Sequence, residues 1–303
     1  MKHGRALLSK RRWIALLLFV VLGCGSFCLA QRYGRWGGEG WLPNSDTIRT
    51  AREAPSHSNE TPMWTNTPAF KHDVFTFARV RYHRSSYGSR TAGEWHTDFP
   101  DSDLNLSFRI QELTSIKVDP EGRVIDLTDK ELFDYPWIYM VEPGRLLLED
   151  DEVPILRKYL LNGGFLMADD FWGDVQWENF ASELKRVLPE AQWVDLPMTH
   201  PVFHTVFPLN YPKNKMQVPN VMQGIRSQYD GITWEYHDGE ECTEVHFRAL
   251  FDAKGRMIVM ACHNTDNGDG WEREGEDVYF FHRFSENIAY PLAINIITYT
   301  MTH

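Results

Sequence analysis

Acidic and imidazole side chains recur in this sequence at the points where apolar runs end. Asp169 and Asp170 follow the apolar run 165–168, and His263 follows the apolar run 256–262. Carboxylates and imidazoles are the side chains that hold divalent metals and transfer protons. If the apolar runs are parallel strands, their carboxyl ends meet at one edge of a sheet, where open α/β sheets bind ligands. The pattern therefore predicts a polar site at that edge.

We expect Asp169 or Asp170 to act as a general base or metal ligand, with His263 as its partner. Because the two aspartates are adjacent, they point to opposite faces if both lie within a strand, and one of them enters the site. The same side chains suit a divalent metal, whose identity the pattern leaves unknown. The residues expected to contact the ligand are Asp98, Trp172, His200, His204, Asn264 and Asp266.

Two of these histidines have an alternative interpretation. His200 and His204 have the spacing of one helical turn, which would form a metal-binding pair on a helix. Pro201 follows His200 directly, however, and residues before proline avoid the helical conformation. The alternative is a pair of loop histidines bonded to the backbone.

The sequence has no nucleophile motif. A Gly-x-Ser-x-Gly elbow, a P-loop and a dinucleotide fingerprint are all absent. Cys262 ends an apolar run but does not lie on a glycine-bounded turn. Cys242 and Cys262 either form a disulfide or are two small buried apolar residues, and the second interpretation is favoured because a chain of this size needs no covalent cross-link.

Apolar runs of strand length alternate with helical patterns in the middle of the chain. The expected order is strand 137–141, helix 149–161, strand 165–168, a helix from Trp177 to Leu188, and strand 193–196. Such alternation predicts a mostly parallel sheet with helices on both faces.

Elements outside this middle part complete the predicted domain. The run 74–82 is the first strand, a helix begins near Asp103, and 291–301 is a buried helix. Two turn sequences predict hairpins, Asp119-Pro-Glu-Gly122 between 116–118 and 124–127, and Asp252-Ala-Lys-Gly255 between 244–251 and 256–262. The second hairpin is expected to supply antiparallel edge strands.

The amino-terminal thirty residues have the pattern of an export segment. Five basic residues and no acid accompany an apolar run that begins at Trp13, and small residues end the segment at Ala30. A cleaved signal peptide, a retained anchor within 13–30 and lipidation at Cys24 are all compatible with this pattern. Each places the rest of the chain outside the cytoplasm, in the periplasm or cell envelope.

Composition suggests the remaining boundaries and the class of partner. Residues 31–72 are rich in glycine, proline and small polar residues, which predicts a flexible linker, although Trp36, Trp41 and Trp64 are expected to dock on the domain. Residues 73–303 form a single α/β domain. The net charge of −11 argues against nucleic acid as a partner. It leaves a small polar ligand or an envelope protein, with membrane contact only through the amino-terminal segment.

Several ordered motifs resemble the bacterial domain-of-unknown-function family 4159. They are Glu142-Pro-Gly, the run from Tyr159 to Gly173, His200-Pro-Val-Phe-His, His263-Asn-Thr-Asp with Gly270-Trp-Glu, and Ala289-Tyr-Pro-Leu-Ala-Ile-Asn. The resemblance extends from about residue 75 to residue 303. It implies no established activity.

A fainter resemblance links Asn162-Gly-Gly, His200-Pro and Gly255-Arg-Met-Ile-Val-Met-Ala to the ThuA-like proteins of the class I glutamine amidotransferase-like fold. It implies a flavodoxin-like sheet and a carbohydrate or other small polyol as ligand, with Trp95, Trp172 and Trp271 available to stack on sugar faces. Amidotransferases of that fold carry a cysteine nucleophile after the strand that corresponds to 165–168. Aspartates occupy that position here, so glutamine hydrolysis is not expected.

Two functional hypotheses follow. The first is an exported domain that binds or processes a small polar ligand at the carboxyl edge of the sheet. The second is a catalytically inert envelope module that recognises a protein, in which the loop acids bond to backbone amides.

Overall fold

The computed structural model describes residues 42, 45–58, 60–70, 73–84 and 95–303. Leu42–His303 forms one compact unit. The predicted export segment 1–30 and residues 31–41 of the predicted linker, with Trp36 and Trp41, lie outside the described residues. Within the part of the chain that is described, no helix has the length and apolar character needed to cross a membrane.

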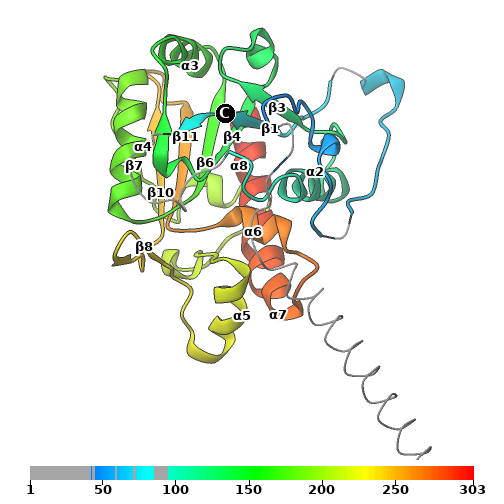
Figure 1. Cartoon of the computed structure of the whole chain (residues 1–303), viewed down its shortest axis with the longest axis vertical. Helices are drawn as coiled ribbons and strands as arrows, with labels where there is room; N and C mark the ends of the chain where they lie inside the picture. Colours follow the sequence, from blue (N-terminus) through cyan, green and yellow to red (C-terminus); the bar gives the residue numbers. More distant parts are fainter. Residues whose placement is uncertain (1–41, 43–44, 59, 71–72, 85–94) are drawn as a thin grey trace, which may run out of the picture. The chain divides into compact units, whose positions relative to one another are not determined.

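A seven-stranded sheet forms the centre of this unit, with the strand order β3-β1-β4-β6-β11-β10-β7 (Figure 1). Its strands are β1 (Ala78–Arg81), β3 (Arg123–Asp126), β4 (Trp137–Val141), β6 (Phe165–Phe171), β7 (Val194–Asp195), β10 (His246–Phe251) and β11 (Met257–His263). The first five strands of that order are parallel neighbours, and β10 is antiparallel to both β11 and β7. Numbered along the chain, the parallel strands have the order 2-1-3-4-5 of a flavodoxin-like sheet. The predicted fold class is confirmed.

Helices cover both faces of the sheet, and α4 and α8 lie on opposite sides of it (Figure 1). The helices are α2 (Asp101–Leu113), α3 (Glu152–Leu161), α4 (Gly173–Val187), α5 (Val221–Asp230), α6 (Asn267–Glu272), α7 (Val278–Phe280) and α8 (Tyr290–Thr302), which continues the π-helix η7 (Phe281–Ala289). Short 3-10 turns are η1 (Ala51–Glu53), η2 (Pro68–Phe70), η3 (Lys130–Asp134), η4 (Pro143–Arg145), η5 (Pro201–Phe203) and η6 (Lys213–Lys215). Two small ribbons pair β2 (His83–Arg84) with β5 (Leu146–Leu147) and β8 (Tyr236–His237) with β9 (Glu240–Glu241).

The alternation of side chains along β6 creates two separate cores. Leu166 and Ala168 pack in the core under α3 and α4, whereas Phe165 and Met167 pack in the core under α2 and α8. The helix α4 buries one apolar face, for example at Phe180, and has basic residues in its last turn, which complement the helix dipole.

The hairpin predicted at Asp119-Pro-Glu-Gly122 is wrong. Val118 forms a parallel bridge with Phe75, and β3 pairs parallel with β1 in the register Ala78 to Arg123. The turn does not reverse the chain. The two runs that flank it, 116–118 and 124–127, therefore lie beside the same segment, 75–81, and are parallel to it. The hairpin predicted at Asp252-Ala-Lys-Gly255 is confirmed, because β10 and β11 pair across it.

Residues before 73 pack on the domain. The amide of Ala51 donates to the carbonyl of Glu121 at 2.9 Å, and the carbonyl of Arg49 accepts from the amide of Val124 at 2.8 Å. The indole of Trp64 donates to the carbonyl of Val118 at 2.9 Å, as expected for a docked tryptophan. The compact unit therefore includes residues within the predicted linker.

One buried cation, Arg79 on β1, organises the loop that enters α2. Its side chain is 0% exposed and uses all five N–H donors of the guanidinium. Nη1 donates to the carbonyls of Trp95 and Thr97 at 3.1 and 2.9 Å, and Nε donates to both carboxylate oxygens of Asp103 at 3.0 Å. Nη2 donates to Ser102 Oγ at 2.8 Å and to Asp103 Oδ1.

We expect Arg79→Met to destabilise the protein by about 3–5 kcal/mol, because the substitution leaves the buried carboxylate of Asp103 without its partner. Urea unfolding followed by circular dichroism measures the change. Arg157→Met is the matched control, because the pair of Arg157 with Glu190 lies on the surface and should contribute nothing measurable. Equal effects of the two substitutions would contradict this account.

Candidate functional site

Four acids follow the carboxyl ends of parallel strands. Asp98 lies in the loop after β1, Glu142 directly follows β4, Asp170 lies at the end of β6, and Asp266 follows β11. These strands run side by side as β1-β4-β6-β11, so their carboxyl ends share one edge of the sheet. That edge includes the boundary between β1 and β4, the switch point at which flavodoxin-like sheets bind ligands.

Three of these acids meet in one place. Asp98, Asp170 and Asp266 each offer a carboxylate oxygen, and the three oxygens lie within 4.8 Å of one another. We call them the three-carboxylate site. Their exposed fractions are 6%, 7% and 5%, so all three are buried.

The charges around the three-carboxylate site are mainly negative. Burial raises the pKa of Asp170 well above its ordinary value, and the nearby acids Glu142, Asp98 and Glu235 raise it further. Burial likewise raises the pKa of Asp266, with Asp170 as the foremost neighbouring charge. Among the described residues, no arginine, lysine or histidine forms an ion pair with Asp170 or Asp266. The site thus favours the uptake of protons or of a cation.

Asp170 occupies an irregular position in its strand. Ala168 pairs with Ala261 and Phe171 with His263, so β6 has one more residue than β11 over this stretch. Asp170 has φ 55°, in the left-handed region that is uncommon for residues other than glycine. Such bulges re-aim a side chain and are frequent beside active sites. The indole of Trp172 donates to Asp170 Oδ1 at 2.8 Å and holds the carboxylate in place.

Left-handed backbone is concentrated at this edge. Asp98, Glu142 and Asn264 have φ of 61°, 44° and 59°. Each such conformation costs about 1–3 kcal/mol and persists only where the surroundings impose it. The bonds of Arg79 to the carbonyls of Trp95 and Thr97 impose it around Asp98.

A second group of acids shares Asp98. Carboxylate oxygens of Asp98, Asp269 and Glu272 also lie within 4.8 Å of one another. Here Arg273 supplies a cation, because its Nε lies 2.5 Å from Glu272 Oε2 and 3.6 Å from Asp269 Oδ1. The second group is therefore compensated within the chain, and we assign the ligand site to the first.

Asp169 has a structural role outside the three-carboxylate site. Its Oδ2 accepts from the amides of Asn267 and Gly268 at 2.9 and 3.1 Å, and its Oδ1 accepts from Asn267 Nδ2 at 2.7 Å. Burial raises the pKa of Asp169 to about 7. Asp169 thus anchors the start of α6, while Asp170 enters the site, as expected when only one of two adjacent aspartates faces the ligand.

The structure does not bring His263 into the three-carboxylate site. Its Nε2 lies 3.0 Å from the carbonyl of Gly173, and its Nδ1 lies 3.2 Å from Arg248 Nη1. Burial lowers the pKa of His263 to about 3, so the ring is neutral, donates to Gly173 and accepts from Arg248. The ring packs on Phe171 and Trp177 on the α4 face of the sheet, which explains why it does not pair with Asp170.

Asn264 and Trp172 lie beside the site and position its loops. Asn264 Oδ1 accepts from the amide of Gly173 at 2.8 Å, and its Nδ2 donates to the carbonyl of Glu244 at 2.8 Å. Trp172 is 2% exposed and stacks on His237, with 5.4 Å between ring centroids and 11° between planes. Its face is therefore covered, and Trp95 and Trp271 are buried as well. None of these three tryptophans offers an open platform for a sugar.

His200 and His204 lie at the opposite edge of the sheet. The ring of His200 is 6.3 Å from the ring of Phe251, and Phe251 pairs with Met257, the first residue of β11. Asp266 follows the other end of that strand. His200 Nδ1 accepts from the amide of Val202 at 3.3 Å, and His204 Nε2 bonds to the carbonyl of Met198 at 2.7 Å. The structure thus shows the alternative interpretation, loop histidines bonded to the backbone.

The structure agrees with the favoured interpretation of the cysteines, two small buried residues and no disulfide between them. Cys242 and Cys262 are both free and buried. Burial raises the pKa of the Cys242 thiol to about 11 and that of Cys262 well above its ordinary value. Neither thiol has the electropositive surroundings that activate a nucleophile.

Two neighbours of the site, Glu235 and His237, were not predicted from the sequence. His237 Nε2 lies 3.0 Å from Glu235 Oε2, and the carboxylate of Glu235 is one of the acids that raise the pKa values of Asp170 and Asp266. His237 lies in the ribbon β8-β9 and Glu235 directly precedes it. Because this ribbon is not part of the main sheet, neither residue follows a strand of that sheet.

We expect Asp170→Asn to reduce the dependence of stability on pH. A carboxyl whose pKa is raised on folding stabilises the native state below its ordinary pKa, and this contribution is lost as the pH rises through the folded value. The free energy of unfolding of the wild type should therefore fall as the pH rises above the ordinary carboxyl pKa, and that of the variant should fall less. Denaturant titrations across this range of pH measure the difference. Parallel curves would contradict it, and the exposed Asp174→Asn is the control.

Comparison with known proteins identifies the family. The model of a family described as a domain of unknown function, DUF4159, matches residues 76–301. No curated protein matches the chain. The fainter resemblance to ThuA-like proteins stays an expectation. The match spans most of the chain, and it covers β1 to α8 and all three residues of the three-carboxylate site, so the chain belongs to the DUF4159 family.

Proposed function

We propose that the domain binds a small polar ligand at the three-carboxylate site through a divalent cation held by Asp98, Asp170 and Asp266. The observation that carries this proposal is the convergence within 4.8 Å of three buried carboxylates from separate parts of the chain, the end of β6 and two loops. The charge of Asp170 raises the pKa of Asp266, and a bound cation would relieve this repulsion.

The ligand set favours a hard cation. Ca²⁺ and Mg²⁺ prefer oxygen ligands and complete their coordination with water or with ligand oxygens. A carbohydrate or another polyol has hydroxyl oxygens that can replace those waters. This supports a polyhydroxylated molecule as the ligand class, held at the carboxyl edge where α/β sheets bind small molecules.

The site also has groups for proton transfer if the ligand is processed. A cation lowers the pKa of a bound water or hydroxyl. His237 is oriented by Glu235 at 3.0 Å and stacks on Trp172, which in turn bonds to Asp170. It replaces His263 as the imidazole available to accept such a proton, because both ring nitrogens of His263 are engaged.

We infer that the domain acts outside the cytoplasm, in the periplasm or cell envelope. The basic and apolar segment 1–30 supports export, by cleavage or as an anchor. The acidic net charge of −11 supports a partner other than nucleic acid.

A second candidate function is an inert envelope module that recognises a protein. It is supported by main-chain bonds to acids near the site. Asp169 accepts from the amides of Asn267 and Gly268, and Asp269 Oδ2 accepts from the amide of Val221 at 2.6 Å. Asp266 Oδ1 likewise accepts from the amide of Asp269 at 2.7 Å. Among the described residues, no main-chain amide donates to the carboxylate of Asp170, and this favours the first candidate.

Isothermal titration of the 31–303 segment with Ca²⁺, Mg²⁺ and Mn²⁺ tests the proposal. We expect one cation to bind, with release of protons, because Asp170 and Asp266 must lose theirs to ligate it. Asp170→Asn and Asp266→Asn should each weaken binding by about tenfold or more, a range typical of losing one metal-site group.

His200→Gln is the matched control, since His200 lies at the opposite edge of the sheet. If none of the three cations binds, or if the two aspartate variants bind as the wild type does, the inert module becomes the better account.

A further inference from the structure

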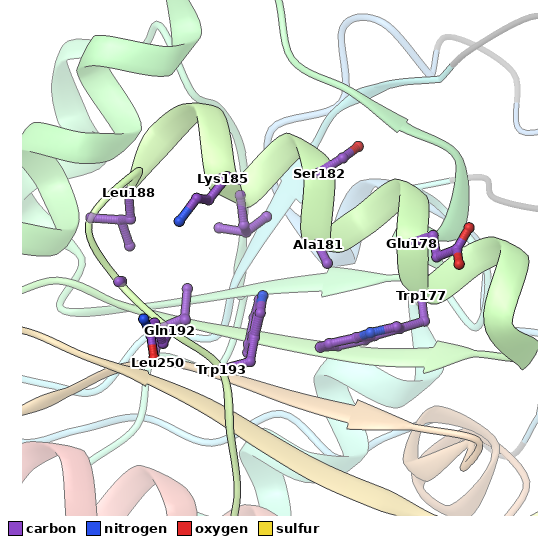
Figure 2. Close-up of a pocket in the computed structure, with 11 residues that line it drawn as sticks. Trp177, Glu178, Ala181, Ser182, Lys185, Leu188, Gln192, Trp193 and Leu250 are labelled. Carbon is purple, nitrogen blue, oxygen red and sulfur yellow. The ribbon is translucent and has the colours of Figure 1, made fainter.

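We propose that a hollow beside α4 binds a neutral oligosaccharide. The hollow lies between α4 and the segment 188–193 that returns to β7, and its volume is about 460 Å³ (Figure 2). We call it the tryptophan hollow, after Trp177 and Trp193. The inference takes only the ligand class from the proposed function, because the residues of the hollow and of the three-carboxylate site are different.

The floor of the hollow is apolar. Leu184, Leu188 and Leu250 line it and are buried. Its sides carry Ala181 and Ala191, whose small side chains leave the space open. The size is within the range of about 300–1,000 Å³ that is typical of ligand sites.

Two tryptophans form one end of the hollow. The rings of Trp177 and Trp193 lie 5.0 Å apart and meet edge to face, at 66°. Arg248 lies 3.9 Å from the ring centroid of Trp177, and the ring of His263 lies 5.5 Å away, so Trp177 is supported from behind. Both tryptophans are only half-buried. They therefore give a preformed aromatic wall, unlike the buried tryptophans near the carboxylates.

Polar side chains surround this apolar surface. Glu178, Ser182, Lys185 and Gln192 line the hollow and are all exposed, the first three on α4 and the last on the returning segment (Figure 2). One acid and one base give the rim no net charge, in a chain of net charge −11. The rim thus suits a neutral ligand, whereas an anionic one would be repelled by the chain as a whole.

The apolar floor, the aromatic wall and the polar rim together favour a carbohydrate over an apolar ligand. The rim offers both hydrogen-bond donors and acceptors, and hydroxyl groups can pair with either. A sugar ring can place its C–H face on Trp193 and the apolar floor while its hydroxyls bond to the rim. A purely apolar ligand would leave the rim groups without partners and would remove them from water at a cost.

The test uses three soluble oligosaccharides as probes: cellohexaose, maltohexaose and N-acetylchitohexaose. Calorimetry or intrinsic tryptophan fluorescence of the 31–303 segment measures binding without added cation and with Ca²⁺. We expect at least one probe to bind, and Trp193→Ala to weaken that binding at least tenfold.

Ala181→Leu provides a second variant that removes no ligand-binding group. The larger side chain fills the hollow over an apolar floor, so the fold should persist while binding is lost. Phe133→Ala is the control for Trp193→Ala, because Phe133 is an aromatic residue, 45% exposed, on η3 and outside the hollow. Circular dichroism confirms that each variant is folded.

The outcomes separate this inference from the proposed function. Loss of binding in Trp193→Ala and Ala181→Leu, with Asp170→Asn unaffected, supports the tryptophan hollow and not the carboxylates as the sugar site. Loss in Asp170→Asn alone supports the three-carboxylate site and overturns the hollow. Failure of all three probes to bind the wild type at millimolar concentration overturns the hollow as well, whatever the cation titration shows.

Discussion

The buried ion pair between Arg79 and Asp103 fixes the loop on which the candidate site depends. Arg79 sits on the strand next to the switch point, and its guanidinium holds the carbonyls of Trp95 and Thr97, which directly precede Asp98 in the loop. Removing one partner of such a pair is far more costly than the pair itself is stabilising, because a buried charge would remain unpaired. The ion pair of Arg79 with Asp103 therefore fixes the conformation of this loop. It brings Asp98, with its left-handed backbone, to the edge where Asp170 and Asp266 also end.

The carboxylates at that edge destabilise the folded state and are suited to binding a ligand. A β-bulge places Asp170 in a left-handed conformation, and burial together with neighbouring acids disfavours its ionised form. The chain compensates the adjacent pair Asp269 and Glu272 with Arg273 but supplies no comparable cation to Asp170 or Asp266 among the described residues. Groups held at such a cost are characteristic of functional sites, where an external partner completes the charge balance.

The sequence was informative wherever a local pattern decides the structure. The alternation of apolar runs with helical patterns predicted the parallel sheet, and the residues after those runs included Asp170 and Asp266. The placement of His263 was not predictable in this way, because the bulge in β6 sets the register with which His263 meets its neighbour, and register decides the face. His200 follows a strand in sequence, yet its loop returns to the opposite edge. Glu235 and His237 reach the site from a segment outside the sheet, a tertiary contact with no local signal.

The most direct test of the central claim is a crystal structure of the domain grown with Mn²⁺, with anomalous diffraction recorded to locate the metal. The account predicts a single anomalous peak bonded to oxygens of Asp98, Asp170 and Asp266. A peak confined to the group of Asp98, Asp269 and Glu272, or three carboxylates in contact with no metal between them, would contradict it.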